Sequence, residues 1–174
     1  MFTKNYTNML KCLSCPGANS DKYSVTKPDG TTVYLIQSGT PMGAKYTSLQ
    51  GIQYGSSSSI FYNGYPVIAL GNNTTAESEN DYSVGFISGF AMTTATAFTY
   101  VDGVYTETIN FYLTNTTENE ISFQEIGLYT VANRYSGSSS GNWDYLIYRK
   151  VFDAPVVVPS GNAITLTISF SSEV

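Results

Sequence analysis

Two cysteines stand three residues apart near the start of the chain, in the stretch KCLSCPG. A Cys-x-x-Cys pair of this kind can act as a redox dithiol or supply half of a zinc site. Zinc would need two more ligands, and the sequence contains no histidine and no further cysteine. A redox dithiol needs a helix N-terminus to lower its pKa, whereas Cys12 and Cys15 lie toward the end of an expected helix. We therefore expect inert thiols, with a disulfide or a metal shared between subunits as the alternatives.

Other catalytic arrangements find little support in the sequence. The absence of histidine excludes Ser-His-Asp and Cys-His catalysis, and no phosphate-binding glycine motif is present. Several acidic residues fall mostly in turns or at outward strand positions, and none forms an evident glycosidase pair. They are Asp102, Glu107, Glu118, Glu120, Glu125 and Asp144. We expect no enzyme activity, no catalytic residue, no metal site and no cofactor.

The stretch ESEND, residues 77–81, gathers three carboxylates at alternating positions. Hard oxygen ligands of this kind can hold Ca²⁺, although the spacing differs from that of an EF-hand. Solvated carboxylates are the preferred interpretation, and calcium is the alternative.

Tyrosine occurs 15 times and tryptophan once. Aromatic side chains can stack on sugars, and they are also enriched in the cores of protein–protein interfaces. Trp143, Tyr145 and Tyr135 are the candidate surface aromatics for either role.

The first 15 residues predict the one clear helix. Its apolar residues recur at helical spacing and share one face, and Pro16 and Gly17 end the pattern. That face consists of Phe2, Tyr6, Met9, Leu10 and Leu13. It can cap the chain's own domain or dock on another subunit, and it is our candidate docking face.

The rest of the chain predicts short strands separated by turns. Lys27–Gly30 and Asp102-Gly103 are hairpin turn signals, and residues 109–113 and 164–170 alternate between apolar and polar. The apolar parity shifts near Gln124-Glu125, which predicts a bulge there. We expect an all-β fold: a β-sandwich, immunoglobulin-like or jelly-roll-like, with a short N-terminal amphipathic helix. Residues 16–174 would form one domain, with an irregular Gly/Ser/Tyr-rich segment at 38–64.

The chain of 174 residues has only 12% charged residues and a net charge of −5. It has no basic stripe, so we expect no nucleic-acid partner. It also has no apolar run of about 18 residues and no signal peptide, so we expect no membrane partner and synthesis in a cytoplasm.

Three stretches of the chain resemble small virion proteins of tailed bacteriophages. They are the opening MFTKNYTNMLK, the loop IALGNNTTAESENDYSV, and a C-terminal part with EIGLY at 125–129 and VVVPSGNAITLTISF at 156–170. The resemblance implies a non-enzymatic virion structural protein, present in many copies or as a homo-oligomer and assembled in the host cytoplasm. It favours a capsid-associated accessory protein, for capsid decoration or at the base of a head fibre, with the major capsid protein as partner. The alternatives are a tail or neck component beside tail or portal proteins, or a carbohydrate-binding module of a tail fibre.

Overall fold

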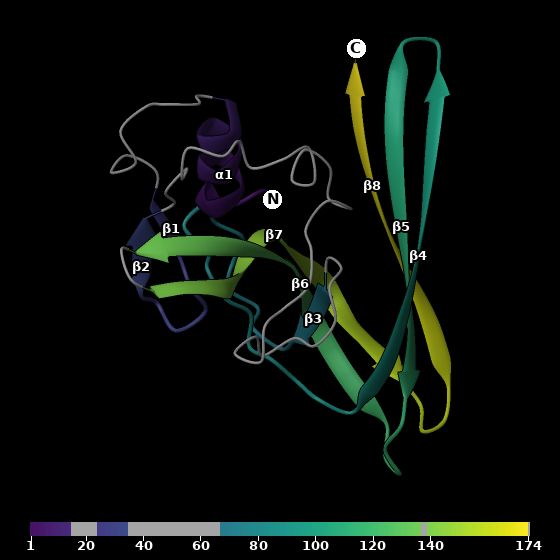
Figure 1. Cartoon of the computed structure of the whole chain (residues 1–174). Helices are drawn as coiled ribbons and strands as arrows, with labels where there is room; N and C mark the ends of the chain where they lie inside the picture. The colour runs from purple at the N-terminus through teal and green to yellow at the C-terminus, as the bar shows by residue number, and fades with distance from the viewer. Residues whose placement is uncertain (15–23, 35–66, 137–138, 174) are drawn as a thin grey trace. The chain divides into compact units, whose positions relative to one another are not determined.

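The structure is a computed structural model that describes residues 1–14, 24–34, 67–136 and 139–173. These residues form one N-terminal helix and eight strands (Figure 1), so the predicted all-β fold with a short N-terminal helix is confirmed. No helix in this part of the chain has the length and apolarity needed to span a bilayer. The elements are α1 (Lys4–Ser14), β1 (Ser24–Thr26), β2 (Thr32–Tyr34), β3 (Val67–Gly71), β4 (Phe90–Val101), β5 (Val104–Asn115), β6 (Ile121–Ser136), β7 (Ser139–Val158) and β8 (Ala163–Glu173).

The chain divides into two compact units, each made of two separate stretches of sequence. Unit 1 consists of Met1–Ile87 and Gln124–Ala154, and unit 2 of Ser88–Phe123 and Pro155–Val174. The helix belongs to unit 1. The irregular segment expected at 38–64 lies outside the described residues.

Unit 1 is built on a three-stranded sheet of order β3-β6-β7. β3 and β6 pair antiparallel from Val67↔Tyr129 to Gly71↔Glu125. Residues 125–129 of β6 are all buried, so the strand is covered on both faces. Burial on both faces accounts for the change of apolar parity that predicted a bulge, and the β3–β6 ladder is continuous across these residues.

At both edges of the unit 1 sheet, backbone from outside the sheet forms hydrogen bonds to the edge strand. At β7, the first three residues of the chain form an antiparallel bridge: Thr3 N–H donates to Ile147 O at 3.0 Å, and Arg149 N–H donates to Met1 O at 3.0 Å. At β3, Phe86 bridges to Gly71, and Ile87 N–H donates to Leu70 O at 2.8 Å. Backbone groups at these positions of the two edges are therefore paired within the unit.

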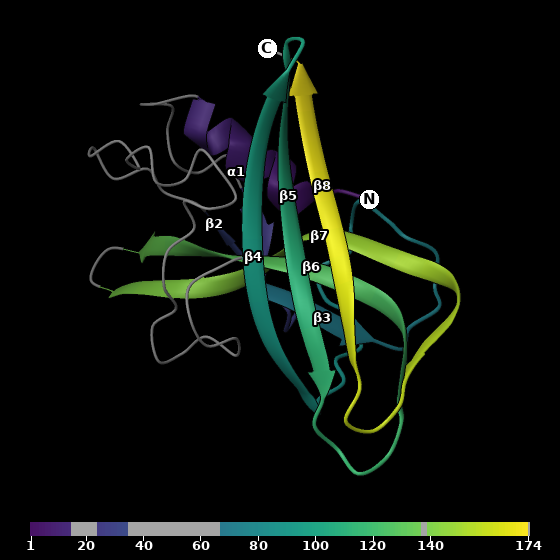
Figure 2. The ribbon, with the colours of Figure 1, turned by 90° about the vertical axis from the view of Figure 1, so that its right-hand side faces the viewer.

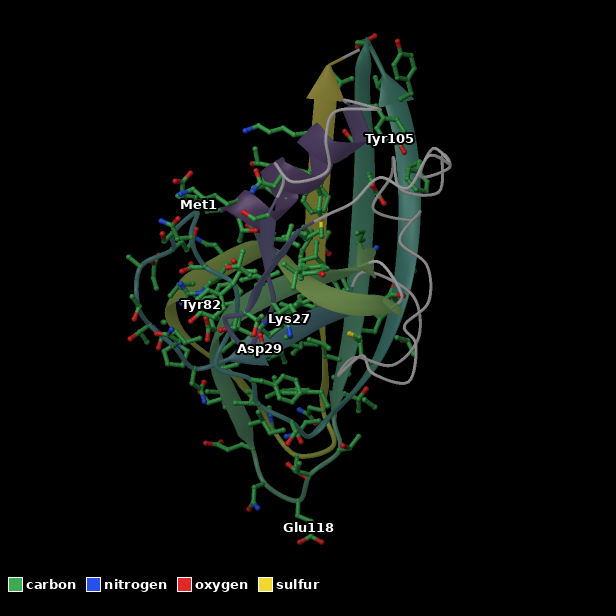
Figure 3. The ribbon with its side chains drawn as sticks, turned by 60° about the vertical axis from the view of Figure 1, so that its left-hand side comes forward. Met1, Lys27, Asp29, Tyr82, Tyr105 and Glu118 are labelled. Carbon is green, nitrogen blue, oxygen red and sulfur yellow. The ribbon has the colours of Figure 1, made fainter. Side chains whose placement is uncertain are left out.

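A small hairpin, β1-β2, completes unit 1 and confirms the turn predicted at Lys27–Gly30. Gly30 N–H donates to Lys27 O at 2.9 Å, and Gly30 adopts a φ of 81°, which glycine tolerates without a steric cost. Asp29 accepts a hydrogen bond from Thr31 N–H at 2.8 Å and forms an ion pair with Lys27 at 2.8 Å (Figure 3). These bonds hold the pKa of the Asp29 carboxyl down to about 2.

Unit 2 is built on a three-stranded antiparallel sheet of order β4-β5-β8. Figure 2 looks onto this sheet, with β4 along one edge and β8 along the other. The predicted turn at Asp102-Gly103 is confirmed, with φ values of 50° and 79° that suit a tight hairpin turn. β4 and β5 then pair without interruption, from Val101↔Val104 to Phe90↔Asn115.

The two faces of the unit 2 sheet differ in composition. One face is apolar along β5, where Ile109, Phe111 and Leu113 are at most 2% exposed, and each such side chain contributes about 1.5–3 kcal/mol. The other face carries small hydroxyl side chains that bond across strands, such as Thr106 to Ser171 at 2.8 Å. The alternation predicted for β5 and β8 is therefore present in the structure.

Asn115 ends β5 and organises the loops at that end of unit 2. Its side chain is 0% exposed. Its amide nitrogen donates to Asn119 O at 2.8 Å and to Val158 O at 2.9 Å, and its amide oxygen accepts from Thr117 N–H at 2.9 Å. A single buried side chain thus satisfies polar groups from three places in the sequence.

Candidate interaction surfaces

A buried ion pair lies at the centre of unit 1. Arg149 on β7 is 2% exposed and Glu125 on β6 is 0% exposed, and Arg149 Nε donates to Glu125 Oε2 at 2.7 Å. The sequence-based assignment of Glu125 to an outward position is wrong, because its carboxylate is buried and pairs with Arg149. Burial of such a pair costs desolvation energy, which is offset only when the remaining hydrogen-bonding groups also find partners.

The partners of this ion pair come from the loop between β3 and β4, residues 72–86. Glu125 Oε1 accepts from Asn73 N–H at 3.0 Å and from Gly85 N–H at 2.7 Å, close to the two ends of the loop. Arg149 donates to Asp81 Oδ2 at 2.8 Å and to Thr75 O at 3.1 Å, in the middle of the loop. One ion pair therefore binds this loop near both ends and at Asp81 in its middle.

Glycine is required where this loop meets β6. A Cβ on Gly71 would come within 2.5 Å of both Glu125 Oε1 and Gly85 O. A Cβ on Gly127 would come within 2.6 Å of Val84 and 2.7 Å of Leu146. Both positions therefore exclude any larger residue without a shift of backbone or core side chains.

The three carboxylates of ESEND each face a cation within unit 1. Asp81 meets Arg149, Glu79 lies 3.0 Å from Lys4 Nζ, and Glu77 lies 3.0 Å from the N-terminal ammonium of Met1. The described residues contain no group of three side chains that could hold a metal ion. The geometry favours a structural role for this cluster over the calcium alternative.

Glu77 also binds β7, an edge strand of the unit 1 sheet. Its Oε1 accepts from Val151 N–H at 2.9 Å and lies 3.3 Å from Lys150 Nζ. Partial burial acts to raise the pKa of Glu77, but the hydrogen bonds from Val151 and from the N-terminal ammonium outweigh it and hold the pKa below its usual value.

Helix α1 is attached to the β1-β2 hairpin by asparagine side chains. Asn5 Nδ2 donates to Thr26 O at 2.8 Å, and Asn5 Oδ1 accepts from Thr26 N–H at 2.7 Å. One helical turn later, Asn8 Nδ2 donates to Ser24 O at 2.7 Å. Asn5 is 5% exposed, so its amide takes the place of a neighbouring strand at the edge of β1.

The candidate docking face lies beside this polar attachment. The Phe2 ring stacks on Tyr6 at 4.4 Å and meets Tyr148 edge-on at 5.6 Å. Phe2 is 39% exposed and Leu10 is 43% exposed, and Met9 is half-buried. Leu13 and Cys12 lie within α1, but their side chains, like the whole of Cys15, fall outside the described residues.

The prediction that Tyr145 is a surface aromatic is wrong, because its side chain is 0% exposed. It lies on β7 beside Leu146 and Ile147, which are also 0% exposed, in a part of the strand covered on both faces. Trp143 lies on β7 and Tyr135 on β6, and their side chains are outside the described residues. The structure therefore removes Tyr145 from the candidate surface aromatics.

The tip of the β4–β5 hairpin is an exposed apolar patch that the sequence prediction missed. Phe98 is 39% exposed, Tyr100 65% and Val101 63%, and the Phe98 ring stacks on Tyr105 with 5.8 Å between centroids. Figure 3 places Tyr105 near this tip and Glu118 at the opposite end of unit 2. The signal in the sequence is FTYVDGVY, in which large apolar residues flank a tight turn instead of the polar residues usual there.

Glu107 is a buried carboxylate on the apolar face of β5. It is 5% exposed, it lies in register between Phe98 on β4 and Phe170 on β8, and its Oε1 accepts no hydrogen bond. Burial raises the pKa of Glu107 because the charged form loses its hydration. The sequence-based assignment to an outward position is wrong here also, although its parity with Ile109 and Phe111 indicates the apolar face.

Comparisons of this chain with protein-family models, with curated proteins and with solved structures find no match.

Proposed function

We propose that this chain is a non-enzymatic structural protein of a bacteriophage particle, bound to the capsid as a decoration or head-fibre-base protein. It assembles in the host cytoplasm through contacts with other virion proteins, above all the major capsid protein, and is present in many copies. The proposal combines the resemblance of the sequence to phage virion proteins with one structural observation, the orientation of α1.

The polar side of the helix bonds to its own unit, and Phe2 on the apolar side also contacts Tyr148 of β7. Successive residues of a helix are about 100° apart, so Asn5 and Asn8 mark one side and Tyr6 and Leu10 another. In most amphipathic helices the apolar side packs on the domain and the polar side faces solvent. Here the asparagines bond to β1, while Leu10 remains 43% exposed. This arrangement supports a role for the apolar side in docking on another protein.

The ion pairs of unit 1 support a structural role as well. Four charged side chains bind the 72–86 loop to the sheet or bind the edge strand β7: Arg149, Glu125, Asp81 and Glu77. A catalytic group needs a reactive atom that can reach substrate, whereas the atoms of these groups are already bonded within the protein.

The proposal is tested by locating the protein on purified particles of the phage that encodes it. Antibodies against the chain, detected with gold by electron microscopy, should label the head. Label confined to the tail or neck would contradict the capsid assignment, and absence of the protein from particles would contradict a virion role.

A pair of helix variants tests the docking side. Leu10→Asp places a charge on the exposed apolar side and should reduce incorporation into particles at least tenfold. Lys11→Asp is the matched control, because Lys11 is exposed on the same helix and lies about 100° around the helix from Leu10. Equal incorporation of the two variants, with normal folding by circular dichroism, would rule out docking through this side of α1.

A further inference from the structure

The sheet of unit 2 has two long edges, β4 and β8. Among the described residues, neither edge pairs with a further strand. An unpaired edge presents a row of N–H and C=O groups that another strand can bind. Natural proteins usually protect such edges with lysine, proline, a bulge or a covering element.

β4 has none of these protecting features in its sequence. Its 12 residues, FAMTTATAFTYV, contain no charged residue and no proline. Its register with β5 is unbroken from Phe90 to Val101, so no bulge turns the edge away. Its tip carries Phe98, Tyr100 and Val101 with 39–65% of their surface exposed. A long, uncharged and partly apolar edge of this kind favours pairing with another strand.

We propose that β4 pairs antiparallel with β4 of a second copy of this chain, around a two-fold axis that passes beside Ala95. The two three-stranded sheets then form one continuous six-stranded sheet. A two-fold axis perpendicular to the sheet keeps each face on its own side, so apolar residues continue the apolar face and small polar residues continue the polar face.

The register around Ala95 is chosen because it matches side chains across the axis. Phe90 lies opposite Tyr100 of the second copy, and Met92 lies opposite Phe98 of the second copy. Aromatic pairs and aromatic–sulfur contacts both stabilise neighbouring strands. On the other face, Thr93 lies opposite Ala97 of the second copy, so only small side chains meet there.

Charge favours a second copy as the occupant of this edge. The chain carries a net charge of −5, yet the 11 residues that pair in this register, 90–100, are all uncharged. The nearest acidic group along the chain, Asp102, falls beyond the last pair. Two copies therefore meet along β4 without the repulsion that their net charges would cause on most other surfaces.

The geometry also favours β4–β4 pairing over the other combinations. β4 and β8 both run antiparallel to β5, so joining β4 to β8 of another copy by rotation about the strand direction would give a parallel ladder, which is less stable per residue. Such head-to-tail contacts also leave an unused β4 edge at one end and an unused β8 edge at the other, so they do not close at two copies. On β8 the exposed side chains from Ala163 to Ser171 are all alanine, threonine or serine, so that edge offers less apolar surface.

The expected interface is modest in size. Eleven antiparallel pairs span about 37 Å, and a single strand ladder falls near the lower end of specific interfaces, at about 1,200 Å² in total or less. We therefore expect a dimer that forms and separates on the order of micromolar concentration. The inference rests on the edge of β4 alone and is independent of the assignment to a phage particle.

Disulfide cross-linking tests the register directly. Cys12 and Cys15 are first replaced by serine, and Ala95→Cys is introduced at the proposed axis, where Ala95 is exposed. Paired residues in neighbouring strands lie about 4.5–5.5 Å apart between Cα atoms, within the range that a disulfide bridges. Under mild oxidation, the A95C variant should convert mostly to a covalent dimer.

Two matched variants control for random collision and for the other edge. A97C lies on the same face of β4, but its two copies would be about 14 Å apart along the strands, beyond disulfide reach. A163C lies on β8. At least tenfold faster cross-linking of A95C than of both controls supports the inference. Equal rates for A95C and A97C, or fastest cross-linking of A163C, would overturn it.

A charge-repulsion variant gives a second readout without cysteine chemistry. Thr93→Lys with Ala97→Lys places two pairs of like charges opposite each other in the proposed register and should weaken the dimer about tenfold in sedimentation. Ala163→Lys with Thr165→Lys adds the same charge to β8 and should leave the dimer unchanged. A wild-type chain that stays monomeric at hundreds of micromolar, or that pairs through β4 only with a different protein, would refute self-association.

Discussion

The two sheets of this molecule differ in whether further backbone pairs with their edge strands. In unit 1, the first residues of the chain pair with β7, and Phe86–Ile87 pair with β3. In unit 2, β4 and β8 have no further strand beside them among the described residues. Unit 1 thus pairs backbone groups at both edges of its sheet, whereas both edges of the unit 2 sheet remain without a described partner strand.

Buried carboxylates show the same contrast. Glu125 in unit 1 accepts hydrogen bonds from Arg149 and from two backbone N–H groups. Glu107 in unit 2 is nearly as buried, but its Oε1 has no partner and its pKa is raised by burial. A satisfied buried charge holds a loop in place, while an unsatisfied one destabilises the folded state at neutral pH.

The largest expected effect comes from breaking the ion pair of unit 1. Arg149→Met leaves the Glu125 carboxylate buried without its cation and should lower the free energy of unfolding by about 3–5 kcal/mol. The loss is measurable by urea unfolding followed through fluorescence of Trp143, the single tryptophan, which lies in unit 1. Lys27→Met removes a pair with the exposed Asp29 and should cost less than about 1 kcal/mol. An equal loss in the free energy of unfolding for the two variants would contradict the claim that the buried pair contributes more than the exposed one.

A stabilising change is expected in unit 2. Glu107→Met replaces the buried carboxylate by an apolar side chain of similar size and should raise the free energy of unfolding at pH 7 by about 1–3 kcal/mol. The readout is slower hydrogen exchange of the β5 amides near Ile109 and Phe111. Faster exchange in the variant would show that the carboxylate stabilises unit 2 through an interaction not seen in the structure.

The two units should also respond to pH with opposite signs. The pKa of Glu107 is raised above its ordinary 4.5, so its contribution to stability is greatest below pH 4.5 and is lost as pH rises through the folded-state value. The pKa of Glu77 is lowered, so its contribution is present above pH 4.5 and is lost as pH falls through a lower value. Hydrogen exchange between pH 7 and pH 4.5 should therefore show β5 gaining protection, and E107M should abolish that gain.

A loss of stability smaller than that of Arg149→Met is expected at the attachment of α1. Asn5→Ala removes both hydrogen bonds to Thr26 and leaves two backbone groups without them, so it should cost about 1–3 kcal/mol in the free energy of unfolding of unit 1. Thr7→Ala is the control, because Thr7 is exposed on the same helix. An unchanged stability of N5A would mean that the apolar side of α1, and not the asparagines, attaches the helix.

Local features of this fold could be predicted from the sequence. The helix, the turn at Lys27–Gly30 and the hairpin at Asp102-Gly103 each depend on residues that are neighbours in the chain. The alternation of residues 109–113 likewise indicates which face of β5 is buried, because a strand has a period of two.

Contacts between distant residues could not be predicted in the same way. Glu125 and Arg149 meet because β6 and β7 are neighbours in one sheet, and no local pattern marks either as buried. Tyr145 was misassigned because covering a strand on both faces removes the polar–apolar alternation that separates inside from outside. Asn5 falls outside the apolar face expected for the helix, and no local pattern shows that its side chain bonds to the edge of β1.

Hydrogen–deuterium exchange of the wild-type chain at two concentrations is the most direct test of the central claim. It measures whether the edge strand β4 of unit 2 gains a backbone partner as the concentration rises, while the edges of unit 1 do not change. Amides of β3, β7 and the first three residues should be protected equally in dilute and concentrated protein. About half of the β4 amides bond to β5 and should stay protected, whereas the others point away from β5 and should be exchangeable when dilute and protected when concentrated. Protection of β4 that does not change from nanomolar to hundreds of micromolar concentration would contradict the account.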